Sequence, residues 1–503
     1  MSGFSAESAG EPAPSRTLLL VDDRHVLYRP GTRRVLRPLD RHPANPLLPD
    51  DEPWEDTVAY CSVYRDPESG RYRIWYQAWK SGQGCRLCCA ESEDGIRWEK
   101  PNVGLHAFGD RKDTNILMPV GFGASVVADL RDPDPGRRYK AAFWDSGTVG
   151  GTRLHGLCVA FSPDGIHWAK YAENPVIVGS HGEYMQPPFE DDPKCNTGVS
   201  NRPLSTSDVI DAQWDPVRET FMVYSKTWLD APDGTMHWKR AVVRTDSKDF
   251  IHWTKPQLVM APDEFDGPGG ESELARTTGG GGSGGKQLHS GPAFHYNDMY
   301  FSLLQVMDPE RTGNMPIELA LSRDGYNWER PFRETPFLAP LEDKSKFDAS
   351  IIWSNATPVF LEDEFRFYYG AYGRAWNSSD AKQNSGIGLA TMPRDRFAGV
   401  RPIERIGQIT LKPIDLADWR RITLNADAAN GAVRVEVLNE DGYRVRGFSK
   451  DDAVPLKEDG LDLPVRWKDR GLSDLRGGRC MLRIHLENAT IYAISFGEKG
   501  GAP

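Results

Sequence analysis

Apolar and polar positions alternate in short runs along most of the chain, and turn residues separate the runs. Segments such as YRIWYQAW (72–79) and FRFYYGAY (365–372) are rich in aromatic residues, which favour β-strands. Turn sequences made of Asp, Pro and Gly, such as RDPESG at 65–70, stand next to such segments. The pattern therefore predicts an all-β protein.

One short motif closes each group of three predicted strands. Four copies share Ser-x-Asp-x-x-x-Trp, and a degenerate fifth copy lacks the Trp: SEDGIRW (92–98), SPDGIHW (162–168), SKDFIHW (247–253), SRDGYNW (322–328) and MPRDRF (392–397). The motif returns every 70 to 85 residues, a period that is typical of propeller blades when the content is β. We therefore predict a five-bladed β-propeller, in which the Ser, Asp and Gly build turns and the Trp packs between blades.

The two ends of the chain complete the predicted architecture. LLLVDDRHVL at 18–27 has a strand pattern, and we expect it to pair with residues 385–391 and so close the ring of blades. After about residue 402 the strands are short and alternate with Asn-Gly and Asp-Gly turns, which predicts a β-sandwich. The expected organisation is a disordered tail at 1–17, the propeller at 18–401 and the sandwich at 402–503.

Composition and charge exclude several classes of partner. The 503 residues carry a net charge of −11, which argues against nucleic acid or an anionic membrane as a partner. The N-terminal residues lack the apolar stretch of a signal peptide, and LLLV at 18–21 is too short to span a bilayer, so we expect a cytoplasmic protein.

Motifs for metals and cofactors are also missing from the sequence. Cys85, Cys88 and Cys89 lie in one predicted strand, and no second pair follows at a zinc-like spacing, so we expect buried thiols and no metal site. The sequence holds no dinucleotide-binding glycine motif, no P-loop and no nucleophile elbow, so we expect no redox or nucleotide cofactor.

Several segments resemble the five-bladed propeller glycoside hydrolases of the invertase/levanase and arabinanase groups. They are HPANPLL (42–48), WED (54–56), SVYRDPESGRYRIWYQ (62–77), the repeated turns and the strands of the C-terminal sandwich. The WMNDPNG and Glu-Cys motifs of the invertase family are absent, so the chain looks like a divergent member. The resemblance implies a glycoside hydrolase that acts on short oligosaccharides, with furanosides among the candidates.

Candidate catalytic residues follow from the geometry of a propeller. The loops that enter the innermost strands open on one face, so acidic residues at these entries are expected to converge there. Glycoside hydrolysis needs two carboxyl groups. We predict that Asp56, Asp208, Asp348 and Glu271 are catalytic. Weaker candidates are Asp211, the pair Asp22 and Asp23, and the loop residues Glu183, Glu190 and Glu273.

Residues near the same entries are expected to bind the oligosaccharide: Trp54, Glu55, Asn115, His289, Trp353, Tyr372 and Trp376. Two other functions stay open. A non-catalytic carbohydrate-binding propeller would keep the aromatic residues and lose the paired carboxylates. A phosphorylase or lyase on the same scaffold is the second, and a phosphorylase would need an anion site beside the carboxylates, for which Arg374 and His289 are candidates.

Overall fold

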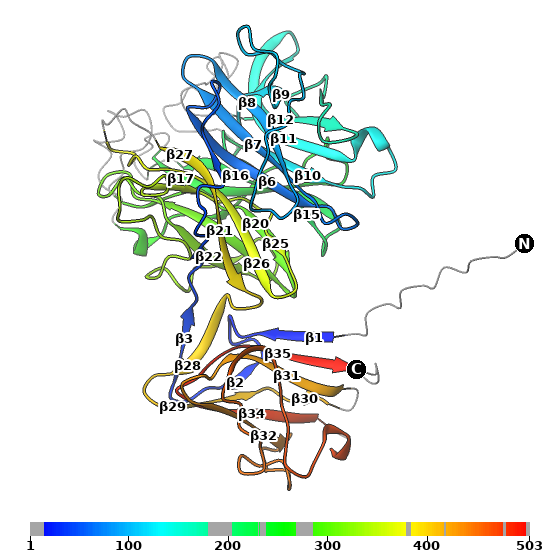
Figure 1. Cartoon of the computed structure of the whole chain (residues 1–503), viewed down its shortest axis with the longest axis vertical. Coiled ribbons are helices and arrows are strands. Elements are labelled where there is room, and N and C mark those ends of the chain that lie inside the picture. Colours follow the sequence, from blue (N-terminus) through cyan, green and yellow to red (C-terminus); the bar gives the residue numbers. More distant parts are fainter. Residues whose placement is uncertain are drawn as a thin grey trace, which may run out of the picture. The chain divides into compact units, whose positions relative to one another are not determined.

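The computed structural model describes residues 15–179, 204–229, 231, 238–267, 285–378, 384–416, 419–475 and 479–498 (Figure 1). The chain divides into two compact units. The first comprises Pro38–Leu361 and Phe365–Thr391, and the second comprises Met1–Arg37, Glu362–Glu364 and Met392–Pro503.

The first unit contains five antiparallel sheets among its described residues, and we call them blades one to five. Blade one has β6 (Thr57–Arg65), β7 (Tyr72–Lys80), β8 (Gly84–Ser92) and β9 (Ile116–Val120). Blade two has β10 (Phe122–Ala128), β11 (Tyr139–Val149), β12 (Thr152–Ser162), β13 (Ala169–Lys170) and β14 (Ile177–Val178). Blade three has β15 (Ile210–Asp215), β16 (Thr220–Leu229), β17 (Lys239–Ser247) and β18 (Gln257–Met260).

The remaining two blades are each entered through two short strands. Blade four has β19 (Gln287–Ser290), β20 (Ala293–Tyr296), β21 (Met299–Met307), β22 (Ile317–Ser322) and β23 (Trp328–Glu329). Blade five has β24 (Ile351–Trp353), β25 (Val359–Phe360), β26 (Glu364–Tyr372), β27 (Ser385–Pro393), β4 (Asp40–Arg41) and β5 (Leu48–Pro49). Short 3₁₀ helices lie at η1 (Pro135–Arg137) and η4 (Glu264–Asp266).

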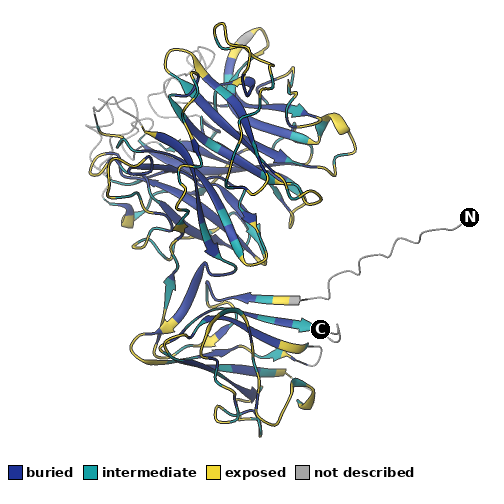
Figure 2. Cartoon of the chain, in the orientation of Figure 1, coloured by how far each residue is buried: buried dark blue, intermediate teal, exposed yellow. Residues whose placement is uncertain are grey.

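The blades form a closed ring because each one packs on the next. Buried apolar clusters join blade one to two, two to three, three to four and five to one, and most blade strands are buried (Figure 2). Phe294 of blade four contacts Phe367 of blade five, which gives the remaining interface. The innermost strands also contact one another, from β6 to β10, β15 and β20 and from β25 back to β6. The predicted five-bladed propeller is therefore confirmed.

The repeated motif forms the same turn in its first four copies. In the first copy the Ser92 hydroxyl accepts a hydrogen bond from the backbone N–H of Gly95 at 2.8 Å. The Asp94 carboxylate accepts from the backbone N–H groups of Ile96 and Arg97, also at 2.8 Å, and these bonds lower the Asp94 pKa. Trp98 then packs edge-on against Tyr368 of blade five, so the expected structural role of the motif is confirmed.

At three interfaces between blades, a polar aromatic side chain of one blade also donates a hydrogen bond to the repeated turn of the next. Trp75 of blade one donates its indole N–H to the Gly165 carbonyl of blade two at 2.7 Å. Tyr224 of blade three and Tyr368 of blade five donate in the same way to Gly325 and Gly95. The propeller therefore uses one bond, repeated at three of its interfaces, to set the spacing of its blades.

The degenerate fifth copy is offset by one residue from the alignment that we expected. Asp395 has a φ of +66°, which matches the φ of +73° at Gly95, not the position of Asp94. Arg394 therefore stands where the other copies have their aspartate. The sequence alignment placed Asp395 there because both are acidic, whereas backbone conformation decides the match.

The ring is closed by a different segment from the one we predicted. Strand β27 pairs with β4 through Ala390 and Arg41, and with β5 through Ile387 and Leu48. Residues 18–27 do not take this place. Strand β1 (Ser15–Leu19) pairs with β35 (Thr490–Glu498) instead, and residues 15–17 therefore belong to a strand and not to a disordered tail.

The second unit is the predicted β-sandwich, and it takes strands from both ends of the chain. One sheet contains β1, β3 (Thr32–Leu36), β28 (Ala398–Pro402), β31 (Trp419–Asp427), β33 (Asp459–Pro464) and β35. The other contains β2 (Val26–Tyr28), β29 (Ile406–Leu411), β30 (Ile414–Asp415), β32 (Ala432–Asn439) and β34 (Arg479–Glu487). A short 3₁₀ helix, η5 (Leu472–Asp474), precedes β34.

The apolar core of the sandwich explains why the N-terminal segment belongs to it. Leu18, Leu20 and Val26 are buried in the same cluster as Ile484 and Ile494. The observed boundaries therefore differ from those predicted at residues 18 and 402, because the N-terminal apolar run packs with the C-terminal strands.

The cysteines of β8 are buried and the described helices are short. Cys85, Cys88 and Cys89 are buried free thiols in β8, and burial raises the pKa of Cys85 and Cys89 to about 12. In the part of the chain that the structure describes, no helix is long and apolar enough to cross a membrane.

Candidate functional site

A connected group of polar and aromatic side chains lies on the innermost strands of four blades and on the strands beside them. We call it the axial cluster. Its members are Tyr60, Asp208, Asp211, Lys226, Arg240, His289, Gln305, Trp353 and Tyr372, and the contacts below connect them.

Tyr60 enters the cluster because β6 is irregular at this point. The register between β6 and β7 shifts between Ala59 and Ser62, and Tyr60 has a φ of +47°. A bulge of this kind turns a side chain away from its expected direction. The Tyr60 ring lies 5.6 Å from the Trp353 ring, which lies 4.7 Å from that of Tyr372. Blades one and five thus supply an aromatic wall.

Two carboxyl groups of blade three lie near Tyr60 and have different partners. Asp208 forms an ion pair with the ammonium group of Lys226, and both Asp208 and Asp211 act electrostatically on the hydroxyl of the partly buried Tyr60. Asp211 is buried and bonds to the Ser290 hydroxyl at 3.1 Å. Burial raises the pKa of Asp211 to about 8, so this carboxyl is largely protonated at neutral pH.

Two cations, Lys226 and Arg240, belong to the cluster and share contacts with the Trp228 ring. Lys226 lies on β16 with its ammonium 5.6 Å from the Trp228 ring. The Arg240 guanidinium lies 4.6 Å from the Trp228 ring and 5.4 Å from the Trp376 ring, and it donates to Gln287 Oε1 at 2.6 Å. Stacking on indole rings holds the guanidinium plane in a fixed orientation.

His289 is neutral and its tautomer is fixed. Burial, followed by the charges of Lys226 and Arg240, lowers the His289 pKa to about 3. Its Nδ1 lies 3.0 Å from Gln305 Oε1, while Gln305 Nε2 donates to Ser354. Because the amide oxygen can only accept, Nδ1 carries the hydrogen and Nε2 keeps a lone pair. Within the described residues Nε2 makes no hydrogen bond, so it can accept one from a ligand hydroxyl.

Comparisons with known proteins found solved structures that are similar to this chain. No protein-family model and no curated protein sequence matches the chain. Among solved structures, an N-acetylgalactosamine deacetylase from F. plautii, in complex with blood group B trisaccharide, is 18% identical. The match covers 71% of this chain and 96% of that one, with a TM-score of 0.44.

Two glycoside hydrolases match over more of the chain. A family 43 arabinoxylan arabinofuranohydrolase from Bacillus subtilis, in complex with cellotetraose, is 12% identical over 92% of this chain and 99% of that one, with a TM-score of 0.39. A family 32 β-fructofuranosidase from Bombyx mori is 11% identical over 92% and 96%, with a TM-score of 0.40. Because these identities are low, the chemistry proposed below rests on the side chains of this chain.

The three predicted catalytic aspartates have separate partners. Asp208 belongs to the axial cluster. Asp56 stands at the entry of β6 with 34% of its side chain exposed, and its bond to Lys80 at 2.6 Å lowers its pKa. Asp348 is only 1% exposed and bonds to Arg41 at 2.5 Å and Tyr369 at 2.8 Å. These bonds connect Asp348 to β4 and β26 of blade five, and Asp348 is not a member of the axial cluster.

Three predicted sugar-binding residues are buried inside blade one. Trp54 is 1% exposed, packs on Phe108 and is covered by Arg111, so its ring is not open for stacking on a sugar. Glu55 and Asn115 both bond to the Tyr76 hydroxyl at 2.7 Å. Burial raises the Glu55 pKa although Lys100 opposes the shift. This network pairs the Glu55 carboxylate and the Asn115 amide nitrogen, whereas Asn115 Oδ1 is buried without a hydrogen-bond partner among the described residues.

The other predicted residues have mixed outcomes. His289, Trp353 and Tyr372 lie in the axial cluster, and Trp376, 48% exposed, stands beside Arg240 of that cluster. Asp23 pairs with Arg29 and Arg34, all three within the second unit. Glu183, Glu190, Glu271 and Glu273 lie outside the described residues. No group of His, Cys, Asp or Glu in the described residues could hold a metal ion.

Lys226, Arg240 and Tyr60 were missed from the sequence. Lys226 is the one charged residue in FMVYSKTWL, and a charge within a buried strand was the available signal. Arg240 stands between Lys239 and the apolar residues of KRAVVRT, a strand that also contains Arg244, so its charge did not stand out. Tyr60 had no such signal, since a strand bulge cannot be seen in TVAYCSVYR.

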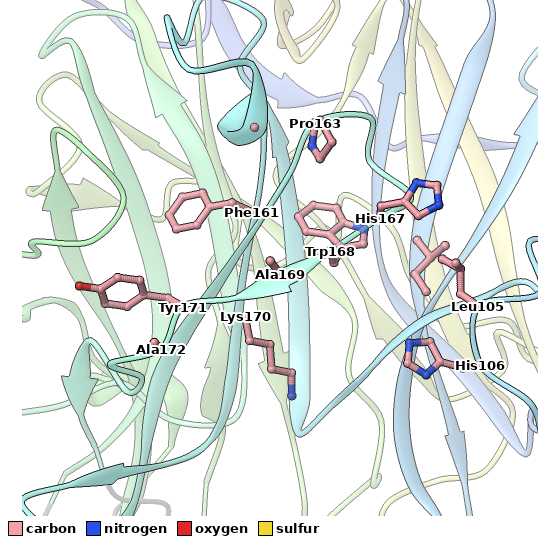
Figure 3. A pocket seen from close by; sticks show the side chains of 12 residues that line it. Leu105, His106, Phe161, Pro163, His167, Trp168, Ala169, Lys170, Tyr171 and Ala172 are labelled. Atoms are coloured by element: carbon pink, nitrogen blue, oxygen red, sulfur yellow. The ribbon is translucent and has the colours of Figure 1, made fainter.

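A separate pocket of about 540 Å³ opens beside the second repeated turn (Figure 3). Phe161, Trp168, Lys170 and Tyr171 are among the residues that line it. Their polar atoms already have partners: Trp168 donates to the Gly165 carbonyl, Lys170 pairs with Asp145 and Tyr171 bonds to Glu173. The axial cluster, with its carboxyl groups and an unbonded ring nitrogen, is the stronger candidate site.

Proposed function

We propose that this chain is a glycoside hydrolase whose catalytic groups are in the axial cluster. The observation that carries the proposal is the pair Asp208 and Asp211, two carboxyl groups near Tyr60. The ion pair with Lys226 favours the ionised form of Asp208, and burial favours the protonated form of Asp211. Glycosidic bond cleavage uses one ionised carboxylate and one protonated acid, and such pairs are found where environments separate the two pKa values.

Each part of the cluster has a role in this proposal. Asp208 is the carboxylate that faces the developing positive charge of the sugar ring, and Asp211 is the proton donor. Tyr60, Trp353 and Trp376 offer aromatic surfaces to the sugar rings. His289 Nε2 accepts a hydrogen bond from a sugar hydroxyl.

A phosphorylase is the second candidate, because Lys226 pairs with Asp208 and the charges of Lys226 and Arg240 both act on His289 of the same cluster. A phosphate bound by these cations would replace water as the nucleophile that attacks the anomeric carbon. The two reactions differ in their product, a free sugar or a sugar phosphate.

Assays with aryl furanosides and pyranosides, with and without inorganic phosphate, test both candidates. We expect aryl alcohol release without phosphate, and a loss of at least about 100-fold in kcat for Asp208→Asn and Asp211→Asn. Release that requires phosphate would establish the phosphorylase instead.

The matched control is Asp215→Asn. Asp215 lies on β15, as Asp211 does, but its carboxylate pairs with the buried Arg244 outside the axial cluster. We expect this variant to lose stability while the folded fraction keeps its kcat. Asn variants of both Asp208 and Asp211 that keep more than about a tenth of the wild-type kcat would contradict the assignment.

A further inference from the structure

The sandwich contains a basic pocket of about 490 Å³ that the proposed hydrolysis does not use. We call it the sandwich pocket, and it is lined by Arg16, His25, Lys412, Asp415, Trp419 and Arg479. Arg16 and Trp419 come from β1 and β31 of one sheet, and Asp415 and Arg479 come from β30 and β34 of the other.

The charge of this pocket is opposite to that of the whole protein. Three of its side chains, Arg16, Lys412 and Arg479, are cations, and one is a carboxylate, whereas the chain carries a net charge of −11. In a strongly acidic protein a concave site with excess positive charge attracts anions, and it does so more strongly than isolated surface cations do.

Two of the cations are held in place by neutral partners. Lys412 donates to the Arg24 carbonyl at 2.6 Å, and Arg479 donates to the Pro413 carbonyl at 2.8 Å. Each bond uses one N–H donor, and in the described part of the chain neither side chain pairs with a carboxylate. Their remaining donors and their charges are therefore available to an anionic ligand.

The remaining groups favour a sugar over a simple anion. Trp419 is half-buried against Phe496, with ring centroids 5.8 Å apart, and it also lines the pocket as an apolar surface. Asp415 would repel a phosphate dianion, but a carboxylate is a good acceptor for sugar hydroxyl hydrogens. An indole, a hydroxyl acceptor and two guanidinium groups together match a sugar ring that carries a carboxylate.

We propose that the sandwich pocket binds the uronic acid residues of an acidic polysaccharide. Arg479, Arg16 and Lys412 bind the sugar carboxylate, Trp419 stacks on the ring and Asp415 accepts from a ring hydroxyl. This binding does not depend on the hydrolase activity proposed for the propeller.

Isothermal titration calorimetry on the full chain tests the proposal with three probes: a galacturonate trisaccharide, neutral galactotriose and inorganic phosphate. We expect the wild type to bind the galacturonate trisaccharide at least about tenfold more tightly than either other probe. We also expect the affinity to fall as salt is raised, because the contact is between charges.

Variants then locate the binding. Arg479→Gln and Lys412→Gln should each weaken binding of the galacturonate trisaccharide by about tenfold or more, which corresponds to the loss of a charged hydrogen bond. Arg401→Gln is the matched control, since Arg401 is an exposed arginine of β28 in the same sandwich and does not line the pocket. It should bind as the wild type does, and all three variants should keep the wild-type Tm.

Three results would overturn the proposal. The first is no binding of the galacturonate trisaccharide by the wild type. The second is unchanged affinity in both Arg479→Gln and Lys412→Gln, which would place the binding elsewhere. The third is equal affinity for galactotriose or for phosphate, which would show that the pocket recognises sugars in general or anions in general.

Discussion

Burial makes both Asp211 and His289 neutral, although one is an acid and the other a base. The Asp211 pKa rises to about 8 and the His289 pKa falls to about 3, because in each case the buried environment disfavours the charged form. At neutral pH the axial cluster therefore contains a carboxyl proton and an imidazole lone pair. Both groups can exchange hydrogen bonds with sugar hydroxyls without carrying charge.

The Asp211 pKa also predicts how stability depends on pH. The folded-state pKa, about 8, lies above the unfolded value of about 3.9, so the folded state binds this proton more tightly. The contribution is present at low pH and is lost as pH rises from about 4 to about 8. We expect Asp211→Asn to flatten the fall of the free energy of unfolding across this window, measured by urea denaturation.

Asp348→Asn serves as the comparison in this experiment, since Asp348 is equally buried but pairs with Arg41. Removing that charge leaves Arg41 with a weaker partner, so this variant should be less stable than the wild type at neutral pH. An Asp211→Asn variant whose pH dependence is as steep as that of the wild type would contradict the assignment of Asp211.

Single residues also mark how far the site could be predicted. Asp208, His289 and Trp353 were predicted from strand entries, and they lie in the axial cluster together with Tyr372, the last residue of β26. Trp54 and Asp348 were predicted in the same way but are buried among other partners, since the start of a strand can be recognised in the sequence and the direction of a flanking side chain cannot. That direction depends on distant partners. Phe108 lies more than 50 residues from Trp54 in the sequence, and Arg41 lies more than 300 residues from Asp348.

The interface between blades two and three differs from the other interfaces in the side chains that fill it. In the first, second and fourth copies of the turn a glycine faces an aromatic residue of the preceding blade, as Gly165 faces Trp75. In the third copy Phe250 takes the glycine position with a φ of +67°, and the preceding blade has Ala142 where Trp75 stands in blade one. Phe250 and Ala142 share one buried cluster, so the bulk has moved from one side of the interface to the other.

A double-mutant cycle tests this exchange. Phe250→Gly should destabilise the protein by about 3 kcal/mol through the cavity it leaves, and Ala142→Tyr should cost about 1–3 kcal/mol through overpacking. The double variant restores the arrangement of the other turns, so its loss in free energy of unfolding should be smaller than the sum by about 2 kcal/mol or more. Strictly additive losses would show that the two positions do not share the space.

At the scale of the whole molecule, the number of blades was predictable and the closure of the ring was not. Four near-identical turns fixed the repeat, because each has the same local hydrogen bonds. Two strand patterns precede blade one, however, and the sequence does not say which sheet each joins. The longer apolar run at 18–27 packs in the sandwich, and two two-residue strands, β4 and β5, close the propeller.

A truncation distinguishes the observed closure from the predicted one. Deleting residues 1–28 removes β1 and β2, which exposes the edges of β35 and β29 in the sandwich and leaves β27 of blade five paired. Hydrogen exchange should therefore show lost protection in β35 and β29 with β27 unchanged. Faster exchange in β27 alone would favour closure by the N-terminal strand.

The pairing of β1 with β35 has a consequence for how the protein is made. Thr17 and Ser495 bond to each other across 478 residues of sequence, so β1 is synthesised long before its partner β35. During synthesis β1 remains an unpaired edge with apolar residues, while the propeller residues that follow it can already fold. A nascent chain that stops before residue 490 never covers this edge. The exposed strand would then distinguish unfinished chains from finished ones for the chaperones and proteases of the cell.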